Sequence, residues 1–430
     1  MSPPAFTPRG APVPEPREVW VVGVGLTAFG RHPERTHRDL VEEATRAALA
    51  DAGSPGLAER LDAVQFGSCG LHAWGQRNAG GQTVLQPLVG AGLLPAGLPI
   101  ANLEGGCATG AMTVHAAAGA IAAGQAEVVL ALGVDKPWMP HDLPGMARLF
   151  EGVLDQLGPE DWREHYVAAA RAEGLEFAPA PGRIALLDVA ALSTRWHMQR
   201  HGTRPEHLAA SASKNHAHGA LNPRAHHQKA MSPEQVLADA PVLAPLTRSM
   251  CAPISDGAAA ALLVSGRALA EVPAATRERA VRLRASALAG GRRRGLAEEP
   301  VTARAARRAY AQAGLGPEAV DVAELHDATS FGELQASECL GFCPAGQGGP
   351  YVASGEAALG GRRPANTSGG LVSKGHPLAA SGLGMLHEVV TQLRGEAGPR
   401  QVPGARVGLV HNAGGLVGLD EALCGVLILG

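Results

Sequence analysis

The order of apparent strands and helices in this chain occurs twice. In each half a strand and a helix precede a second strand, a glycine-rich turn, a buried helix and a further strand. The first half is formed by 19–24, 36–53, 63–67, 103–110, the helix that ends at Gly124, and 127–134; the second contains 302–313, 322–325, 369–377, the helix that ends at Gly395, and 405–411. Such a duplication predicts two half-domains related by a pseudo-twofold axis, with both buried helix N-termini directed at one site.

A cysteine in the first glycine-rich turn and a histidine in the second have similar positions relative to the helix that follows each turn. Cys107 lies 17 residues before Gly124, and Leu378 lies 17 residues before Gly395, so His376 falls near the structural counterpart of Cys107. A thiol at a helix start is close to unpaired N–H groups and to the positive end of the helix dipole, so its pKa should lie below that of a free thiol. A single cysteine can equally be a small buried apolar residue.

The segment between the two halves interrupts this pattern. We expect an N-terminal half of residues 19–137 and 246–272, a C-terminal half of 278–430, and a loop domain, 138–245, that covers the site. Residues 1–18 are rich in proline and are expected to form a disordered tail. The histidines of the loop domain could suggest a metal cluster, but without acidic or cysteine ligands a solvated, partly basic loop is favoured; they are His216, His218, His226 and His227.

Composition excludes several classes of function. The net charge is −3 and aromatic residues make up 3% of the chain, so a nucleic-acid partner is not expected. No apolar run reaches membrane-spanning length and no signal peptide is recognisable, which predicts a cytoplasmic protein without a membrane partner. The six cysteines form no paired CxxC spacing. Cys339 and Cys343 have helical spacing, but no other ligands complete a site, so no metal is predicted.

Several motifs, in this order along the chain, resemble those of the thiolase superfamily. They are Gly106-Cys107-Ala108-Thr109-Gly110, Ser255-Asp256-Gly257, Glu324-Leu325-His326-Asp327 followed by Gly332-Glu333-Leu334, and the segment Ser373-Lys374-Gly375-His376-Pro377. Together with Lys214-Asn215-His216 and Asn222-Pro223-Arg224-Ala225, they are most similar to the sterol-carrier-protein-x-type and bacterial thiolase-like enzymes. The similarity extends from about Val19 to the C-terminus.

This resemblance implies an α/β fold of two duplicated halves in five layers, αβαβα, with an inserted loop domain and a homodimer core. It implies that Cys107 accepts the acyl group, that His376 activates the thiol, and that His326 donates to the thioester oxygen. Asn412, Gly414 and Gly415 would lie in the vicinity of the oxyanion or acid/base site, and the substrate-binding residues would be Lys214, Arg224 and Ser373. The substrate would be an acyl-CoA or acyl-carrier thioester, with no other cofactor.

Two departures from the family pattern change the expected reaction. The second cysteine of a conventional thiolase, in its Cys-x-Gly-Gly motif, is replaced by Asn412, and the cysteine that sterol-carrier-protein-x-type enzymes carry after His-Asp is replaced by Ala328. Neither replacement is a usable base near neutral pH. We therefore expect an acyltransferase that passes its acyl group to an activated carbon, by Claisen-type condensation or C-acylation.

Three alternatives to this acyltransferase stay open. The chain could be a retro-aldol lyase that works with a small zinc-ribbon/OB-fold companion protein, as some thiolase-like relatives do. It could also be a conventional acetyl-CoA C-acyltransferase, or a scaffold subunit without catalysis, although the retained Cys107 and His376 argue against the scaffold.

Overall fold

The computed structural model describes residues 16–179 and 184–430, so most of the tail predicted for residues 1–18 lies outside the described residues. The N-terminal half contains β1 (Val19–Leu26), α1 (His37–Ala52), β2 (Ala63–Gly67), α2 (Gly80–Gly90), β3 (Ile100–Leu103), α3 (Thr109–Ala122), β4 (Val128–Asp135) and, after the intervening segment, β7 (Gly257–Ser265). Two short helices, α9 (Gly266–Ala270) and α10 (Ala274–Arg279), follow β7.

The second half begins with β8 (Val281–Gly290) and α11 (Val301–Ala313). It continues with β9 (Val322–Glu324), α12 (Ser330–Cys339), α13 (Gly348–Ala353), α14 (Gly370–Lys374), α15 (Leu378–Leu393), β10 (Gly408–Gly414) and β11 (Leu423–Leu429). Single turns of 3₁₀-helix are η1 (Pro55–Leu57), η2 (Leu71–Trp74), η3 (Arg248–Met250), η4 (Pro317–Ala319) and η5 (Gly398–Arg400).

The pairing of the strands confirms the internal duplication. Nine strands follow one another in the order β3-β2-β4-β7-β1-β8-β11-β10-β9. In the first half β2 is parallel to β4, and β4, β7 and β1 are successively antiparallel. In the second half β9 is parallel to β10, and β10, β11 and β8 are successively antiparallel. The two half-sheets therefore have the same topology, and they meet where β1 pairs with β8 over Trp20 and Val21.

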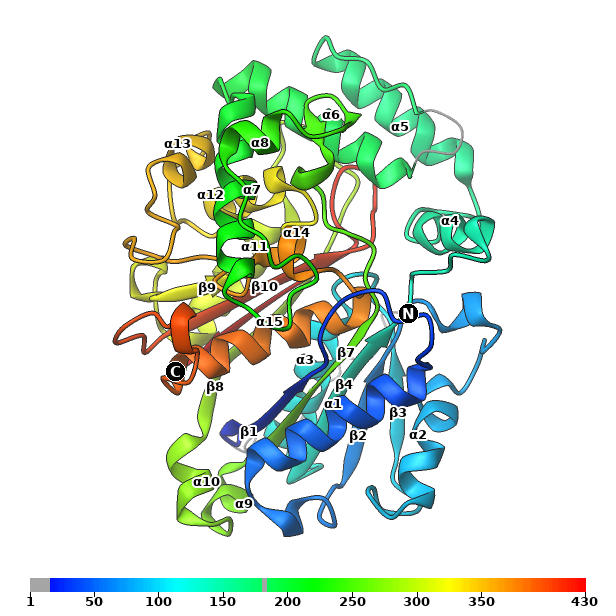
Figure 1. The fold of residues 1–430 in the computed structure, drawn as a ribbon, viewed down its shortest axis with the longest axis vertical. Coiled ribbons are helices and arrows are strands. Elements are labelled where there is room, and N and C mark those ends of the chain that lie inside the picture. The colour runs from blue at the N-terminus through cyan, green and yellow to red at the C-terminus, as the bar shows by residue number, and fades with distance from the viewer. Residues whose placement is uncertain (1–15, 180–183) are drawn as a thin grey trace, which may run out of the picture.

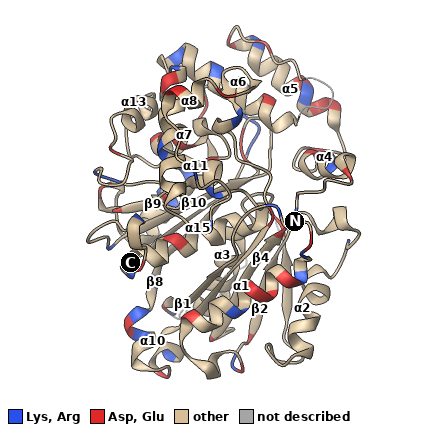
Figure 2. Cartoon of the chain, viewed as in Figure 1, with Lys and Arg blue, Asp and Glu red and all other residues tan. Residues whose placement is uncertain are grey.

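Helices α3 and α15 form the central layer between the two half-sheets (Figure 1). α1 and α2 cover the outer face of the first half-sheet, and α11 covers the outer face of the second. The sequence of α3 explains its position, because it has no charged residue and is rich in alanine and glycine, so two backbones can approach closely. Figure 2 shows charged residues on outer helices such as α1, whereas α3, β1 and β7 carry none.

The segment between β4 and β7 is mostly helical. It forms α4 (Leu143–Glu151), α5 (Pro159–Ala172), α6 (Ala185–His201), α7 (Pro205–Ala220) and α8 (Pro233–Leu237), and the small sheet of β5 (Pro241–Leu243) and β6 (Leu246–Thr247). The expectation of an irregular, solvated loop around the histidines was wrong for His216 and His218, since both lie buried in α7. Among the described residues, no helix is both long and apolar enough to cross a bilayer; the cytoplasmic location stays a prediction.

The N-terminal ends of α3 and α15 cross at two glycines. A Cβ atom added to Gly110 would lie 2.8 Å from the Cα and the backbone N of Gly382, a separation that two packed atoms do not tolerate. An added Cβ on Gly382 would in turn lie 2.2 Å from Oδ1 of Asn412. The crossing therefore depends on glycine at both positions, and it brings the second-half strand β10 close to the helix that follows Cys107.

We predict that Gly110→Ala destabilises the protein by about 1–3 kcal/mol, the usual cost of overpacking a filled interior. Gly119→Ala is the matched control, because Gly119 lies on the same helix and an added Cβ there meets nothing within 4 Å. The control should be neutral or stabilise by up to about 1 kcal/mol through helix propensity. Thermal unfolding of both variants measures the difference, and equal melting temperatures would contradict the tight crossing.

Candidate active site

Three sequence-predicted residues meet at one cavity. Three candidate ligand atoms lie within 4.8 Å of one another: the sulfur of Cys107, a ring nitrogen of His326 and a ring nitrogen of His376. The two imidazole rings are arranged edge to face, with centroids 5.1 Å apart. All three side chains line a cavity of about 800 Å³, together with Gly414 and Gly415.

Cys107 and His376 occupy equivalent positions in the duplicated fold. α3 has its N-cap at Ala108 and α15 has its N-cap at Pro377, so each functional residue comes directly before the N-cap of a central helix. This is a refinement of the sequence comparison, which placed His376 only near the counterpart of Cys107. The pseudo-twofold axis thus brings a thiol and an imidazole together from two similar pieces of chain.

Two side chains, one at the end of β4 and one within β10, form hydrogen bonds between the two halves. Asp135, the last residue of β4, accepts a 2.7 Å hydrogen bond from the backbone N–H of Ala379 at the start of α15. Asn412 of β10 accepts a 3.1 Å hydrogen bond from the N–H of Ala111 at the start of α3. Each half therefore satisfies an otherwise unpaired N–H group in the first turn of the central helix of the other half.

A serine fixes the tautomer of His376. The hydroxyl of Ser381 donates to the carbonyl of Pro377 at 2.8 Å, so the same oxygen must accept from Nδ1 of His376, at 2.7 Å. The imidazole proton is then on Nδ1, and Nε2 carries a lone pair. Burial, followed by the charge of Lys374, lowers the pKa of His376 to about 4. His376 is therefore a neutral hydrogen-bond acceptor at physiological pH.

Asn412 fixes the opposite tautomer of His326. Because its Oδ1 accepts from Ala111, its Nδ2 is the donor, and that group donates to the carbonyl of Cys107 at 2.8 Å and to Nδ1 of His326 at 3.2 Å. Nδ1 of His326 is thus an acceptor and the proton is on Nε2. Burial, and then the neighbouring His376 and His411, hold the pKa of His326 well below its usual range. His326 is a neutral hydrogen-bond donor.

The expected low pKa of Cys107 was wrong. Burial raises the pKa of the thiol to about 12, and the carboxylates of Asp135 and Glu104 add to this effect, which the thiol's own backbone N–H opposes. Cys107 lies two residues before the first residue of α3, and the first-turn N–H of Ala111 is already bonded to Asn412. The N-terminus of α3 consequently stabilises a thiolate less than the position of Cys107 in the sequence suggests. In the resting site a neutral Cys107 thiol lies beside the neutral imidazole of His376.

Glycines allow the backbone of the second half to lie against Cys107. A Cβ on Gly414 would be 2.3 Å from the backbone N atoms of Cys107 and of Ala108. Gly106 has φ +57°, and a Cβ there would be 2.5 Å from the N atom of Gly415. The predicted vicinity of Gly414 and Gly415 to the site is therefore a direct backbone contact around the nucleophile turn.

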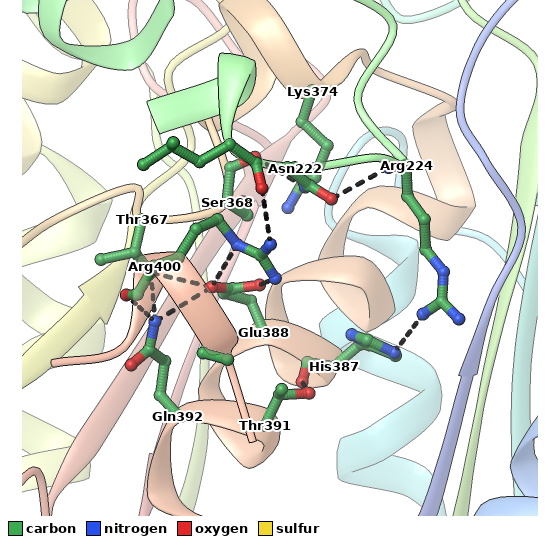
Figure 3. Close-up of polar contacts among 12 residues, drawn as sticks. Asn222, Arg224, Thr367, Ser368, Lys374, His387, Glu388, Thr391, Gln392 and Arg400 are labelled. Carbon is green, nitrogen blue, oxygen red and sulfur yellow. Dashed lines mark hydrogen bonds and ion pairs between the residues drawn. The ribbon is translucent and has the colours of Figure 1, made fainter. Parts of the chain in front are cut away.

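The three predicted substrate-binding residues do not line this cavity. Lys214 is paired with the buried Glu333 at 2.8 Å, and the hydroxyl of Ser373 donates to the carbonyl of His227 at 2.8 Å. Arg224 donates to Nε2 of His387 at 2.8 Å in a separate polar cavity of about 210 Å³ (Figure 3). The structure thus does not bring these three residues together with Cys107.

The side chains that sequence reasoning missed are Asp135 and Ser381. Asp135 is completely buried and also accepts from the hydroxyl of Ser68 at 2.7 Å and from the N–H of Gly70 at 2.8 Å. Burial raises the pKa of this carboxyl to about 6, and its hydrogen bonds oppose that effect. A carboxylate at the end of an apolar strand, and a serine one turn into a glycine-rich helix, were the signals available in the sequence.

Metal ligation is geometrically conceivable at only one place among the described residues. Cys107, His326 and His376 are the one group of three or more candidate ligands there, and thiolate and imidazole are ligands that zinc accepts. The loop-domain histidines, and the pair Cys339 and Cys343, form no such group in the described part of the chain.

Comparison with known proteins shows the family of this chain. Residues 19–148 match the family described as "Thiolase, N-terminal domain", and residues 289–424 match "Thiolase C-terminal domain-like". Sterol carrier protein 2 of Oryctolagus cuniculus is 37% identical over 417 residues, which cover 94% of this chain and 70% of that protein. The acetyl-CoA acetyltransferase of Methanothermobacter thermautotrophicus is 36% identical over 411 residues, covering 94% of this chain and 97% of the relative.

A solved structure with the same fold is the Ltp2-ChsH2(DUF35) aldolase, with a TM-score of 0.74 and 25% identity over 96% of this chain and 98% of that chain. The chain belongs to the thiolase family of acyltransferases. The expected five-layer thiolase fold and the resemblance to sterol-carrier-protein-type members are confirmed.

We predict that iodoacetamide alkylates Cys107 with a rate that keeps rising from pH 7 to pH 11. A folded pKa of about 12 leaves the thiolate fraction increasing about tenfold per pH unit over this range. The chain unfolded in denaturant is the control, and its half-point should be near ~8.5, the value of a free thiol. Mass spectrometry of the Cys107 peptide follows the reaction. A half-point below that of the unfolded chain would mean that the thiolate is already formed.

Proposed function

We propose that this protein forms an acyl-cysteine at Cys107 from an acyl thioester and passes the acyl group to an activated carbon nucleophile. The observation that carries the proposal is the pair of opposite tautomers around one thiol. His376 offers a lone pair and His326 offers an N–H, and each state is fixed by a neighbour. One ring nitrogen of each histidine lies within 4.8 Å of the Cys107 sulfur. A base and an oxyanion donor are what thioester exchange at a neutral thiol requires.

Acylation would consist of attack by the thiol and departure of a second thiol. Nε2 of His376 takes the proton of the Cys107 thiol as the sulfur attacks the thioester carbonyl carbon. The N–H of His326 donates to the oxygen, which becomes negatively charged in the tetrahedral intermediate. The carbon–sulfur bond to the departing thiol then breaks, and the imidazolium of His376 returns the proton to that thiol. The products are the acyl-cysteine and the free thiol.

Three exposed cationic side chains that line the cavity support a phosphate-bearing thioester such as acyl-CoA. They are Arg31, Lys229 and Arg248. His226 and His227 also line the cavity, but burial lowers the pKa of each imidazole, so neither adds a positive charge near neutral pH. Arg31 lies over the ring of Trp138, with its guanidinium carbon 3.7 Å from the ring centroid, and Arg248 forms a 2.8 Å ion pair with Asp239. Cationic side chains at an entrance attract an anionic substrate and increase its rate of association.

Neither of the two positions at which the family resemblance implies an acid/base cysteine for the second half of the reaction carries an acid or base in this chain. The amide of Asn412 uses both N–H groups and its oxygen in hydrogen bonds within the protein, and Ala328, which lines the cavity, has no ionisable group. A positioned acid or base typically contributes 10²–10⁴-fold to a rate. The acceptor that suits this site is consequently a carbanion released by decarboxylation, which needs no proton abstraction, or an enolic or phenolic carbon. The enolic or phenolic carbon attacks first and loses its proton only afterwards, when that proton is much more acidic.

A retro-aldol lyase is the second candidate. The similarity to the Ltp2-ChsH2(DUF35) aldolase over almost the whole chain favours it, and that solved aldolase is named for two proteins. Under this alternative the chain would act with a small companion protein, and Cys107 would not become acylated. The homodimer expected from the family resemblance is a further part of the proposal for either reaction.

We predict that incubation with acetyl-CoA gives an intact-mass increase of one acyl group, located on Cys107. Cys107→Ala should abolish the adduct, whereas Cys251→Ala should retain it, because Cys251 lines the same cavity but has no histidine pair beside it. Co-expression with a companion protein encoded nearby, followed by size exclusion, completes the comparison. Retro-aldol activity that persists in Cys107→Ala, with no adduct on the unmodified protein, would favour the lyase and refute the transferase.

We further predict that Ser381→Ala slows acylation of Cys107 about tenfold, a part of the 10²–10⁴-fold that a positioned base contributes. Without the hydroxyl, the proton of His376 is no longer held on Nδ1, whereas Ser381→Thr should keep most of the rate. Ser337→Ala is the matched control, because Ser337 is also a buried helical serine that donates to the carbonyl four residues earlier. Rapid-quench mass spectrometry gives the rates, and equal loss in both alanine variants would argue against the role of Ser381.

A further inference from the structure

The hairpin between β10 and β11 forms part of the cavity wall. Gly414 and Leu423 pair at its base, and a bridge between Val417 and Asp420 closes its tip. Leu416, Leu419 and Glu421 of this hairpin line the cavity that contains Cys107. The strand that supplies Asn412 therefore continues directly into residues that can touch whatever is bound beside the nucleophile.

The guanidinium of Arg294 is held beside this hairpin by hydrogen bonds from two of its three nitrogen atoms. Its Nε donates to the fully buried Asp420 at 3.1 Å, and its Nη1 donates to the carbonyls of Gly295 and Glu298 at 3.1 and 3.2 Å. Its Nη2 makes no hydrogen bond within the described part of the chain, although Arg294 is only 5% exposed and lines the cavity. Two N–H donors of a buried cation are thus left for an occupant of the cavity.

Glu421 places an unpaired carboxyl group close enough to Arg294 for the two charges to interact. It forms no hydrogen bond with another described residue, and it also lines the cavity. Burial raises the pKa of this carboxyl, while its own backbone N–H and the nearby Arg294 oppose that shift. A carboxyl group in such surroundings gains most from a neutral donor, because the group can then be desolvated without losing its hydrogen bond.

A third polar group comes from α12. Phe331 and Gln335, four residues apart on one face of the helix, both line the cavity, and the Gln335 amide has no hydrogen-bond partner among the described residues. One turn further along this face is Cys339, whose pKa is raised by burial and then by the carboxylate of Glu421. Arg294 also acts on the pKa of Cys339, in the opposite direction, so both charged groups lie near this face of α12. We call Arg294, Gln335 and Glu421, which all line the cavity, the polar patch.

The wall around this polar patch is apolar. Val189, Phe331 and Leu419 are buried side chains that line the same cavity, and the partly buried Leu416 lines it too. A plain hydrocarbon chain would displace water from the three polar groups and return no hydrogen bond to them, which is unfavourable. A second carboxylate would meet the Arg294 donors but would be repelled by Glu421. A hydroxyl group satisfies both, since it accepts from Nη2 of Arg294 and donates to Glu421.

We infer that the acyl group transferred through Cys107 carries a hydroxyl group, which the polar patch of Arg294, Gln335 and Glu421 recognises. The inference rests on the proposed acyl transfer and names the substrate class of that site. Arg294, Gln335 and Glu421 are specificity-determining residues and take no part in bond making. Hydrogen-bonding pockets of this kind reject analogues that lack the polar group much more strongly than apolar pockets reject a missing methylene.

The test compares pairs of acyl-CoA thioesters of six to fourteen carbons, each pair consisting of an ω-hydroxyacyl-CoA and the unsubstituted acyl-CoA. Rapid-quench intact mass gives the rate of Cys107 acylation for each. At the best-fitting length the hydroxylated member should react at least about tenfold faster. Glu421→Leu should reduce this ratio to about one or reverse it, and Glu421→Gln should keep part of it, because the amide oxygen still accepts.

Glu278→Leu is the control variant, since Glu278 is exposed on α10 and does not line the cavity. It should leave the ratio unchanged. Equal rates for both members of every pair, or an equal loss with both members in Glu421→Leu, would overturn the inference while leaving the acyl transfer intact.

Absence of any adduct would instead refute the acyl transfer. In that case calorimetric binding of the same pairs to Cys107→Ala decides the inference separately. Tighter binding of the hydroxylated member supports recognition by the polar patch, and equal binding overturns it.

Discussion

The reciprocal capping of the two central helices is the interaction on which the site depends. Asp135 from the first half holds the start of α15, and Asn412 from the second half holds the start of α3. Each bond satisfies a backbone N–H that would otherwise be buried without a partner, so neither half can move along the other without exposing a polar group to the interior. Cys107 and His376 precede the two capped helices directly, which fixes their separation.

The two capping residues related by the pseudo-twofold axis, Asp135 and Asn412, differ in the hydrogen bonds that they can form. In the strand pairing, Asp135 and Asn412 lie at corresponding positions, two residues beyond the pairs Gly67–Gly133 and Glu324–Val410. A carboxylate can only accept hydrogen bonds, whereas an amide can also donate. The Nδ2 group of Asn412 therefore reaches the carbonyl of Cys107 and the ring of His326, and the tautomer of His326 follows from that difference. Asp135 instead raises the pKa of the nearby thiol.

Much of this arrangement could be predicted from the sequence. The repeated order of elements indicated two similar halves, and β2 has the bounds expected for it, because an apolar run bounded by polar residues and glycine determines a strand locally. The meeting of Cys107, His326 and His376 followed from the motifs. Positions that depend on distant contacts could not be predicted: Lys214 is paired with Glu333, and Arg224 with His387, across more than a hundred residues of chain. The pKa of Cys107 was missed for the same reason, since burial and Asp135 decide it.

The two positions at which the family resemblance implies a second thiol differ in what they contribute to this protein. Ala328 lines the cavity and contributes no polar contact from its side chain, so an alanine there in place of a thiol does not alter the support of the site. Asn412 forms three hydrogen bonds, to Ala111, Cys107 and His326, and a thiol is too short and too weak a donor to replace them. In the proposed reaction the amide would therefore act through His326, whose N–H it fixes as an oxyanion donor for the acylation of Cys107. The acidity of the acceptor carbon would then be left to the acceptor itself.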